Sequence, residues 1–183
     1  MIRIISSIIL LLTLHACKIP DPIIPNEDEV ITTLTYKLTP LTGGSEINLQ
    51  FNDPDGIGGA PPVISGGNLA PNTTYKGVME LINEQLHPPY NITSEIEKEA
   101  LDHQFFFENE NGLLLNIMYD DTDANGHPVG LNTILKTTTA STGTLKITLR
   151  HQPDKSAAEV AGGIISNAGG ETDIEVEFPI HVN

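Results

Sequence analysis

The residues best suited to chemistry lie in a short acidic stretch near the middle of the chain. Residues 121–126 read Asp-x-Asp-x-Asn-Gly, and Asp120 precedes them. Oxygen ligands at alternate positions, followed by a glycine that permits a bend, form the first half of a calcium loop. The glutamate that completes such a loop is replaced by Asn132. The stretch predicts either a metal-free hairpin turn or a simpler calcium cage. The cage would be built from Asp120, Asp121, Asp123 and Asn125.

A second candidate metal site joins residues that are far apart in the sequence. Glu99 and His103 are four residues apart, so a continuous helix would place a carboxylate and an imidazole on one face. If the fold brought His151 close, the three side chains could bind a transition metal such as zinc. The alternative is a solvated helix face, with His103 beginning the next strand, because three ligands must converge before a metal is held.

Composition and motifs narrow the class of function. The 183 residues carry 9 Lys and Arg against 24 Asp and Glu, a net charge of −15, and this excludes the clustered basic surface that nucleic acid requires. The sequence contains no Gly-x-Ser-x-Gly, His-Glu-x-x-His, P-loop or dinucleotide glycine motif. We therefore predict that the protein is not an enzyme, and a hydrolase built from scattered residues ranks third among the alternatives.

The N-terminus predicts a lipid anchor. Residues 1–16 hold one arginine and an apolar run too short to span a bilayer, as in a secretory signal peptide. The run ends in Leu-His-Ala before Cys17, which is similar to the bacterial lipobox, although the histidine departs from it. An ordinary secretory signal is the alternative. Because Cys17 is the only cysteine in the chain, we expect it to be acylated and to hold the protein at the outer membrane of the cell envelope, on either its periplasmic or its cell-surface side.

A linker follows the predicted anchor. Residues 17–29 contain three prolines and end in an acidic cluster. Proline favours extended geometry, so the residues after Cys17 could span roughly 35 Å at about 3.1 Å each. An acidic domain does not adsorb to anionic lipid headgroups, so we expect the domain to stand away from the membrane.

From residue 30 onward the hydrophobicity alternates with a period of two, which predicts strands. The expected strands cover residues 30–39, 47–51, 75–83, 103–108, 113–119, 131–138, 145–149 and 174–182, with one long loop at 53–72. Two short helices are expected at 94–101 and 156–161, each opened by a capping box. The pattern predicts a single immunoglobulin-like antiparallel β-sandwich over residues 30–183. Phe105 and Phe107 should enter its core, whereas Phe106 should either contact a partner or pack beneath a helix.

Six stretches of the chain carry a resemblance to known proteins: 52–56, 72–75, 103–107, 121–126, 150–153 and 169–173. Together they resemble a group of small bacterial envelope lipoproteins often labelled "type 1 periplasmic binding fold" proteins. The resemblance implies an accessory protein that works beside an outer-membrane transporter, with no established ligand. The two-lobed α/β fold of that label needs about twice this length, so we expect the sandwich instead.

These observations predict a lipid-anchored, non-catalytic binding or accessory protein of the cell envelope that partners an outer-membrane transporter. Function usually lies on loops that a rigid scaffold positions, so the loops at 53–72 and 120–130 and the acidic edge of the last strand are the expected contact surfaces. The residues that bind the partner are unknown. The alternative function is a divalent-metal-binding envelope protein, which calcium or zinc would stabilise by mass action.

Overall fold

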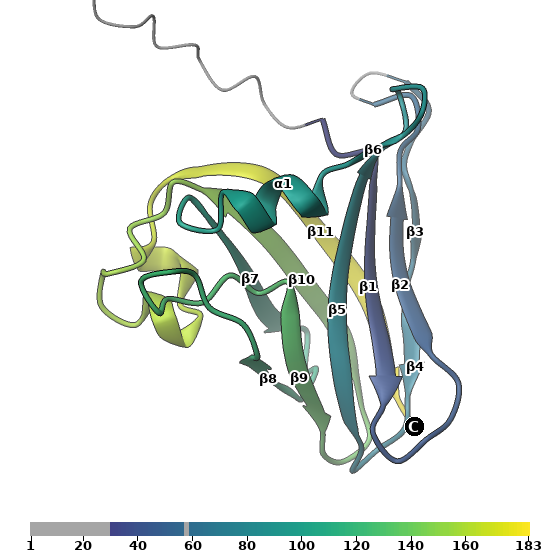
Figure 1. Ribbon diagram of the computed structural model, residues 1–183. Coiled ribbons are helices and arrows are strands. Elements are labelled where there is room, and N and C mark those ends of the chain that lie inside the picture. Colours follow the sequence, from purple (N-terminus) through teal and green to yellow (C-terminus); the bar gives the residue numbers. More distant parts are fainter. Residues whose placement is uncertain (1–29, 57–58) are drawn as a thin grey trace, which may run out of the picture.

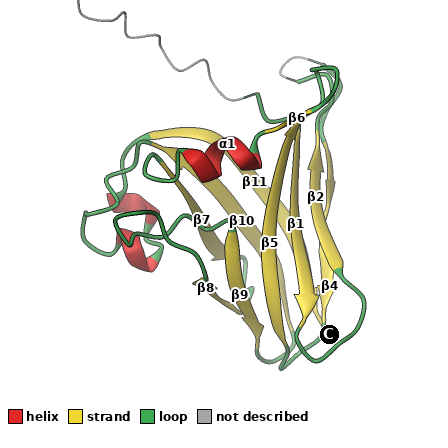
Figure 2. Cartoon of the chain, viewed as in Figure 1, coloured by secondary structure: helices red, strands yellow, loops and turns green. Residues whose placement is uncertain are grey.

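Figure 1 shows the computed structural model, which describes residues 30–56 and 59–183. The predicted signal peptide, Cys17 and the predicted linker lie outside the described residues. The described chain is mainly β-strand, and its sheets pack as a sandwich (Figure 2), which confirms the prediction of a mainly β fold. Within the two described ranges, no helix is long and apolar enough to cross a membrane.

The sandwich has a larger and a smaller sheet. The larger sheet has the strand order β3-β2-β1-β5-β9-β8, with β6 beside β5. Its strands are β1 (Thr33–Pro40), β2 (Ile47–Asn52), β3 (Val63–Ser65), β5 (Thr74–Asn83), β6 (Tyr90–Asn91), β8 (Leu115–Tyr119) and β9 (Asn132–Thr137). The smaller sheet has the order β4-β11-β10-β7. Its strands are β4 (Gly67–Leu69), β7 (His103–Glu110), β10 (Ser141–His151) and β11 (Glu171–Val182).

The core lies between the sheets because alternate residues of each strand face the opposite layer. The buried residues include Leu34, Tyr36 and Leu38 of β1, Tyr75, Met79 and Leu81 of β5, Leu145, Ile147 and Leu149 of β10, and Val176, Phe178, Ile180 and Val182 of β11. Burying a large apolar side chain contributes about 1.5–3 kcal/mol, so a register shift of one residue would lose most of the core. The period-two pattern thus determines which face of each strand is buried.

Phe106 packs beneath 3₁₀ turns and not beneath an α-helix as one of its two expectations had it. Phe105 is fully buried in the main core, and Phe107 packs against that core. Phe106, on the opposite face of β7, is buried in a separate cluster with Val160 and Ala168. That cluster lies beneath two 3₁₀ turns, η1 (Val160–Gly162) and η2 (Ile165–Asn167). Phe106 therefore holds these turns against the outer face of the smaller sheet.

The prediction of two helices is wrong in its details. The only α-helix of the described chain is α1 (Thr93–Lys98), which is shorter than expected, and its N-cap residue Ile92 makes no side-chain hydrogen bond in place of the expected capping box. The second expected helix does not form. The Asp154 carboxylate accepts hydrogen bonds from the backbone N–H and the hydroxyl of Ser156, and Glu159 has a left-handed backbone with φ of 67°. A local aspartate turn and a left-handed residue both interrupt helical geometry.

The segment expected to be a loop at 53–72 contains two short strands that connect the sheets. β3 pairs with β2 in the larger sheet, and β4 pairs in parallel with β11 in the smaller sheet. The chain changes sheet at Gly66, where a Cβ atom would collide with the carbonyl oxygen of Pro179. Strands of three residues are too short to show an alternating pattern, which is why the sequence reads as a loop here.

Candidate functional site

The acidic stretch after β8 forms a loop that its own carboxylates hold together. Asp121 accepts hydrogen bonds from the backbone N–H groups of Gly130 (2.7 Å) and Asn132 (2.8 Å). Asp123 Oδ1 accepts from the N–H groups of Asn125 (2.9 Å) and His127 (3.0 Å). These carboxylate oxygens therefore organise the backbone of the β8–β9 connection.

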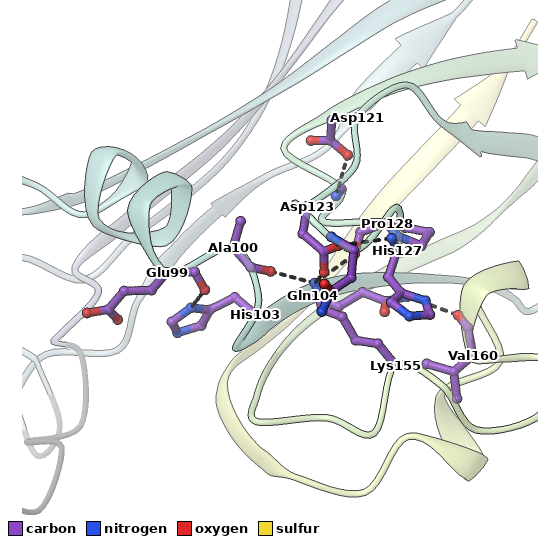
Figure 3. Close-up of polar contacts among 12 residues, drawn as sticks. Glu99, Ala100, His103, Gln104, Asp121, Asp123, His127, Pro128, Lys155 and Val160 are labelled. Atoms are coloured by element: carbon purple, nitrogen blue, oxygen red, sulfur yellow. Dashed lines mark hydrogen bonds and ion pairs between the residues drawn. The ribbon is translucent and has the colours of Figure 1, made fainter.

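A lysine completes this loop in the position where a cation would be expected. The ammonium of Lys155 donates to Asp123 Oδ2 (3.0 Å) and to the carbonyl oxygens of Pro128 (3.0 Å) and Ala100 (2.6 Å), as Figure 3 shows. The Lys155 and Asp123 side chains are 5% and 1% exposed. Three acceptors match the three ammonium hydrogens, so the pair is buried and satisfied. Lys155 joins three loops that are far apart in the sequence.

The predicted calcium ligands do not form a cluster of free oxygens. Asp121 and Asp123 are engaged as described, whereas Asp120 and Asn125 are exposed. Among the described residues, no group of three His, Cys, Asp or Glu side chains is placed to hold a metal ion. Calcium binding stays a prediction, and a calcium ion at Asp123 would compete with Lys155 for its carboxylate. No local pattern marks Lys155 as the partner of Asp123, since 31 residues lie between them.

The Asp123–Lys155 pair predicts a measurable pH dependence. Burial alone would raise the pKa of Asp123, but hydrogen bonds from Lys155 and from the backbone of His127 and Asn125 outweigh burial and hold the pKa below its usual range. A carboxyl with a lowered folded pKa stabilises the fold above its unfolded pKa, near 3.9, and loses that contribution as the pH falls through the folded value. The stability advantage of the wild type over Asp123→Asn should therefore be largest above about pH 4 and shrink below it. Urea unfolding at several pH values checks this, and a constant difference from pH 2 to pH 7 would contradict it.

Of the three residues predicted to bind a transition metal, His103 and His151 lie together, whereas the side chain of Glu99 does not join them. The rings of His103 and His151 stack with centroids 4.9 Å apart, because the two residues are cross-strand partners in β7 and β10. His103 Nδ1 lies 3.0 Å from the backbone carbonyl oxygen of Glu99, whose side chain is exposed. The carboxylate beside the imidazoles belongs to Asp173, with Oδ2 3.8 Å from His103 Nε2. Helix α1 ends at Lys98, so Glu99 and His103 do not share a helix face. Binding of a transition metal such as zinc stays a prediction.

Asp173 also lines an acidic pocket at one end of the sandwich. The pocket has a volume of about 650 Å³, and four carboxylates line it. They come from the loop after β2 and from the first half of β11: Asp53, Asp55, Asp173 and Glu175. The remaining lining residues are mainly apolar, and none is Lys or Arg: Val30, Ile31, Phe51, Ile174, Gly56, Gln85 and Thr172.

The pocket is suited to an amphipathic cation. Four carboxylates, with no lysine or arginine among the lining residues, give a mainly negative field inside a concave surface. A hydrogen bond from the Ala60 N–H holds the pKa of Asp55 below its usual range, so this carboxylate is ionised at neutral pH. Lysine and arginine carry a charged head on an apolar stem, which matches carboxylates beside Val30, Ile31 and Phe51.

The acidic residues of both sides of this pocket can be seen in the sequence, but the sequence does not show that the two sides lie close together in the fold. The sequence around Asp53 and Asp55 predicts a turn, and Glu175 is predicted to lie on the solvent-exposed face of a strand. These two parts of the chain are more than 115 residues apart. Only the packing of the β2 end against the start of β11 brings them together. Comparisons of the chain with protein-family models, curated proteins and solved structures find no match.

Proposed function

We propose that the chain is a lipid-anchored, non-catalytic binding protein of the cell envelope, whose acidic pocket receives a lysine or arginine of a partner protein. Acylated Cys17 would hold it at the outer membrane. Following the resemblance to envelope lipoproteins, we propose an outer-membrane transporter as the partner. The observation that carries the proposal is the acidic pocket, with four carboxylates and no base among its lining residues.

The position of the pocket supports a role close to the membrane. Val30 lines the pocket and is the first described residue, so the pocket lies where the described chain begins. Residue 30 follows Cys17 by 13 positions. An extended linker of that length would keep the pocket within roughly 40 Å of the anchor. A partner embedded in the same membrane would present its extramembrane loops within this distance.

The size of the pocket is sufficient for a side chain of a partner protein. Sites for small molecules usually have volumes of about 300–1,000 Å³ and close around most of the ligand. This pocket of about 650 Å³ is lined by residues of an exposed loop and a strand. A single long side chain from a protein surface fits such a volume and leaves the remainder of the contact to the surrounding loops.

Divalent-metal binding is the second candidate. The stacked imidazoles of His103 and His151, with Asp173 nearby, are nitrogen-rich and so suit a transition metal better than calcium, but among the described residues no three such side chains are placed to hold an ion. Metal binding ranks second because the imidazoles stack on one another and His103 Nδ1 already faces a carbonyl oxygen. We propose no reaction for the protein, and a hydrolase remains the third and least supported candidate.

The proposed site can be tested with minimal ligands by nuclear magnetic resonance. Blocked lysine and arginine amides should shift the amide signals of the pocket residues in the lipid-free mature chain, and blocked norleucine amide, which lacks the ammonium, should not. Replacing Asp55 and Glu175 by Asn and Gln should weaken binding tenfold or more, because even one hydrogen bond to a charged group contributes about 1.5–3 kcal/mol.

Glu177 provides the matched control for this experiment. It lies two residues beyond Glu175 on the same face of β11, is exposed, and does not line the pocket. Glu177→Gln should leave the binding of the lysine amide unchanged. Equal shifts with norleucine amide, or equal weakening by Glu177→Gln, would count against the pocket. A photocrosslinker at residue 55 that captures no outer-membrane transporter in cells would reject the proposed partner.

A further inference from the structure

One edge of the larger sheet has hydrogen-bonding groups that face away from the sandwich. β8 is the last strand of that sheet and pairs only with β9 among the described strands. The Asp120 N–H donates to Asn132 O at 2.9 Å, in the same register as the β8–β9 pairs. In an antiparallel pair the bonded positions alternate, so Asn116 and Met118 also bond to β9. The N–H and C=O groups of Ile117 and Tyr119 therefore point outward.

The bonds on the other side of β9 agree with this assignment. The Met79 N–H donates to Leu131 O, and the Thr137 N–H donates to Thr73 O. The odd-numbered residues of β9 thus bond to β5 and its flanking residues, which leaves the even-numbered residues for β8. At the start of β8, the outward carbonyl of Leu115 accepts a hydrogen bond from the Asn109 side chain. The open part of the edge consequently begins at Ile117.

A pocket of about 500 Å³ runs along this open edge. It is lined by Ile117, Met118, Tyr119, Asp120, Asp121, Thr122 and Pro128 on the β8 side and by Ala161 and Gly162 of η1. Met118 is 40% exposed. The outward backbone groups of Ile117 and Tyr119 thus border space that another chain could enter.

Natural sheets usually protect such edges, and β8 lacks the common forms of protection. A proline, a lysine or a bulge within an edge strand discourages pairing. The five residues of β8 contain no proline or lysine, and their pairing with β9 has no register shift. By contrast, β3, at the other end of the sheet, has three residues and follows two prolines. The two ends of the larger sheet therefore differ in their capacity to accept a strand.

We propose that the β8 edge is a docking site for an extended, basic segment of another protein, which adds to the larger sheet as a strand. Pairing would supply backbone hydrogen bonds to Ile117 and Tyr119, and the exposed Asp120 would attract a basic side chain.

Charge selects the occupant of the edge. A second copy of this chain would bring a net charge of −15 to an acidic edge. The chain's own residues 18–29 hold one lysine against four acidic residues, so they are repelled as well. A basic segment of a different protein is complementary to Asp120 and to the chain as a whole. This site is independent of the acidic pocket, which lies between β2 and β11.

Hydrogen exchange of the full chain in detergent tests the proposal, with a blocked peptide of three Lys-Val repeats as the probe. The peptide should slow exchange of the Ile117 and Tyr119 amides by about tenfold or more at saturation, because both become hydrogen-bonded. A blocked peptide of three Glu-Val repeats should give no protection. Asp120→Asn should weaken binding of the Lys-Val peptide several-fold.

Two variants of Ile117 separate the backbone from the side chain. Ile117→Pro removes the outward N–H without removing a bond to β9 and should abolish the protection of Tyr119, whereas Ile117→Val should retain it. The Asp55→Asn, Glu175→Gln double variant should leave the protection unchanged, which separates this site from the acidic pocket. The proposal is overturned by an absence of protection with the Lys-Val peptide, by equal protection with the Glu-Val peptide, or by protection that survives Ile117→Pro. The wild-type exchange data decide the question even if Ile117→Pro does not fold.

Discussion

Lys155→Met should lower the free energy of unfolding by about 3–5 kcal/mol, because it leaves the Asp123 carboxylate buried without its counter-ion. The wild-type ammonium also holds the carbonyl oxygens of Ala100 and Pro128, and methionine donates to neither. Urea unfolding at pH 7 measures the loss.

Lys146→Met is the matched control for this substitution. Lys146 bridges Glu108 (3.1 Å) and Glu110 (3.0 Å) on the surface, where an ion pair contributes about 0–1 kcal/mol. Replacing both Lys155 and Asp123 by apolar residues should recover part of the loss, since no buried charge then remains unpaired. Equal losses for the two lysine variants would show that burial of the Asp123–Lys155 pair has no special energetic role.

Gly66→Ala should destabilise the fold by about 1–3 kcal/mol, because the added methyl group would collide with the backbone carbonyl of Pro179. The φ angle of Gly66 is not positive, so the expected cost is steric rather than conformational. A backbone carbonyl in the middle of β11 cannot rotate away as a side chain would. Chemical unfolding measures the loss of stability.

Gly162→Ala is the control for the glycine substitution. A Cβ at position 162 has no neighbouring atom within 4 Å, and its φ is also not positive. The variant should be neutral or stabilise the fold by up to about 1 kcal/mol, since alanine has fewer unfolded conformations than glycine. An equal loss of stability in both variants would mean that the strand crossing at Gly66 is not tightly packed.

The fold was predictable wherever a strand is long enough to alternate. The period of two in β10 and β11 shows which side chains are buried. The same alternation in β7 shows that Phe106 points away from the face that carries Phe105. Prediction from periodicity fails at β3 and β4, because three residues are too few to show an alternating pattern and the nearby glycines and prolines suggest a loop. It also fails at residues 156–161, because side-chain capping by Asp154 competes with the helix.

The sequence predicted which types of residue lie in the candidate sites, but it did not predict which of these residues contact one another. The acidic motif correctly marks the connection between β8 and β9, yet nothing near it in the sequence indicates that a distant lysine would occupy its centre. His103 and His151 do meet, because strands β7 and β10 pair in that register, but Asp173 takes the place expected for Glu99. Such partnerships depend on how the sheets and loops pack, which periodicity does not encode.

The place of β11 in the smaller sheet constrains the order in which the chain can fold. β11 is the last strand along the chain, yet it lies between β10 and β4, and the Asn183 N–H donates to Leu69 O. The smaller sheet cannot assemble on the ribosome until this strand has emerged. Pairing residues more than a hundred positions apart is slow, because loop closure must precede the contact. Closure of the smaller sheet is therefore expected to be a late step in folding.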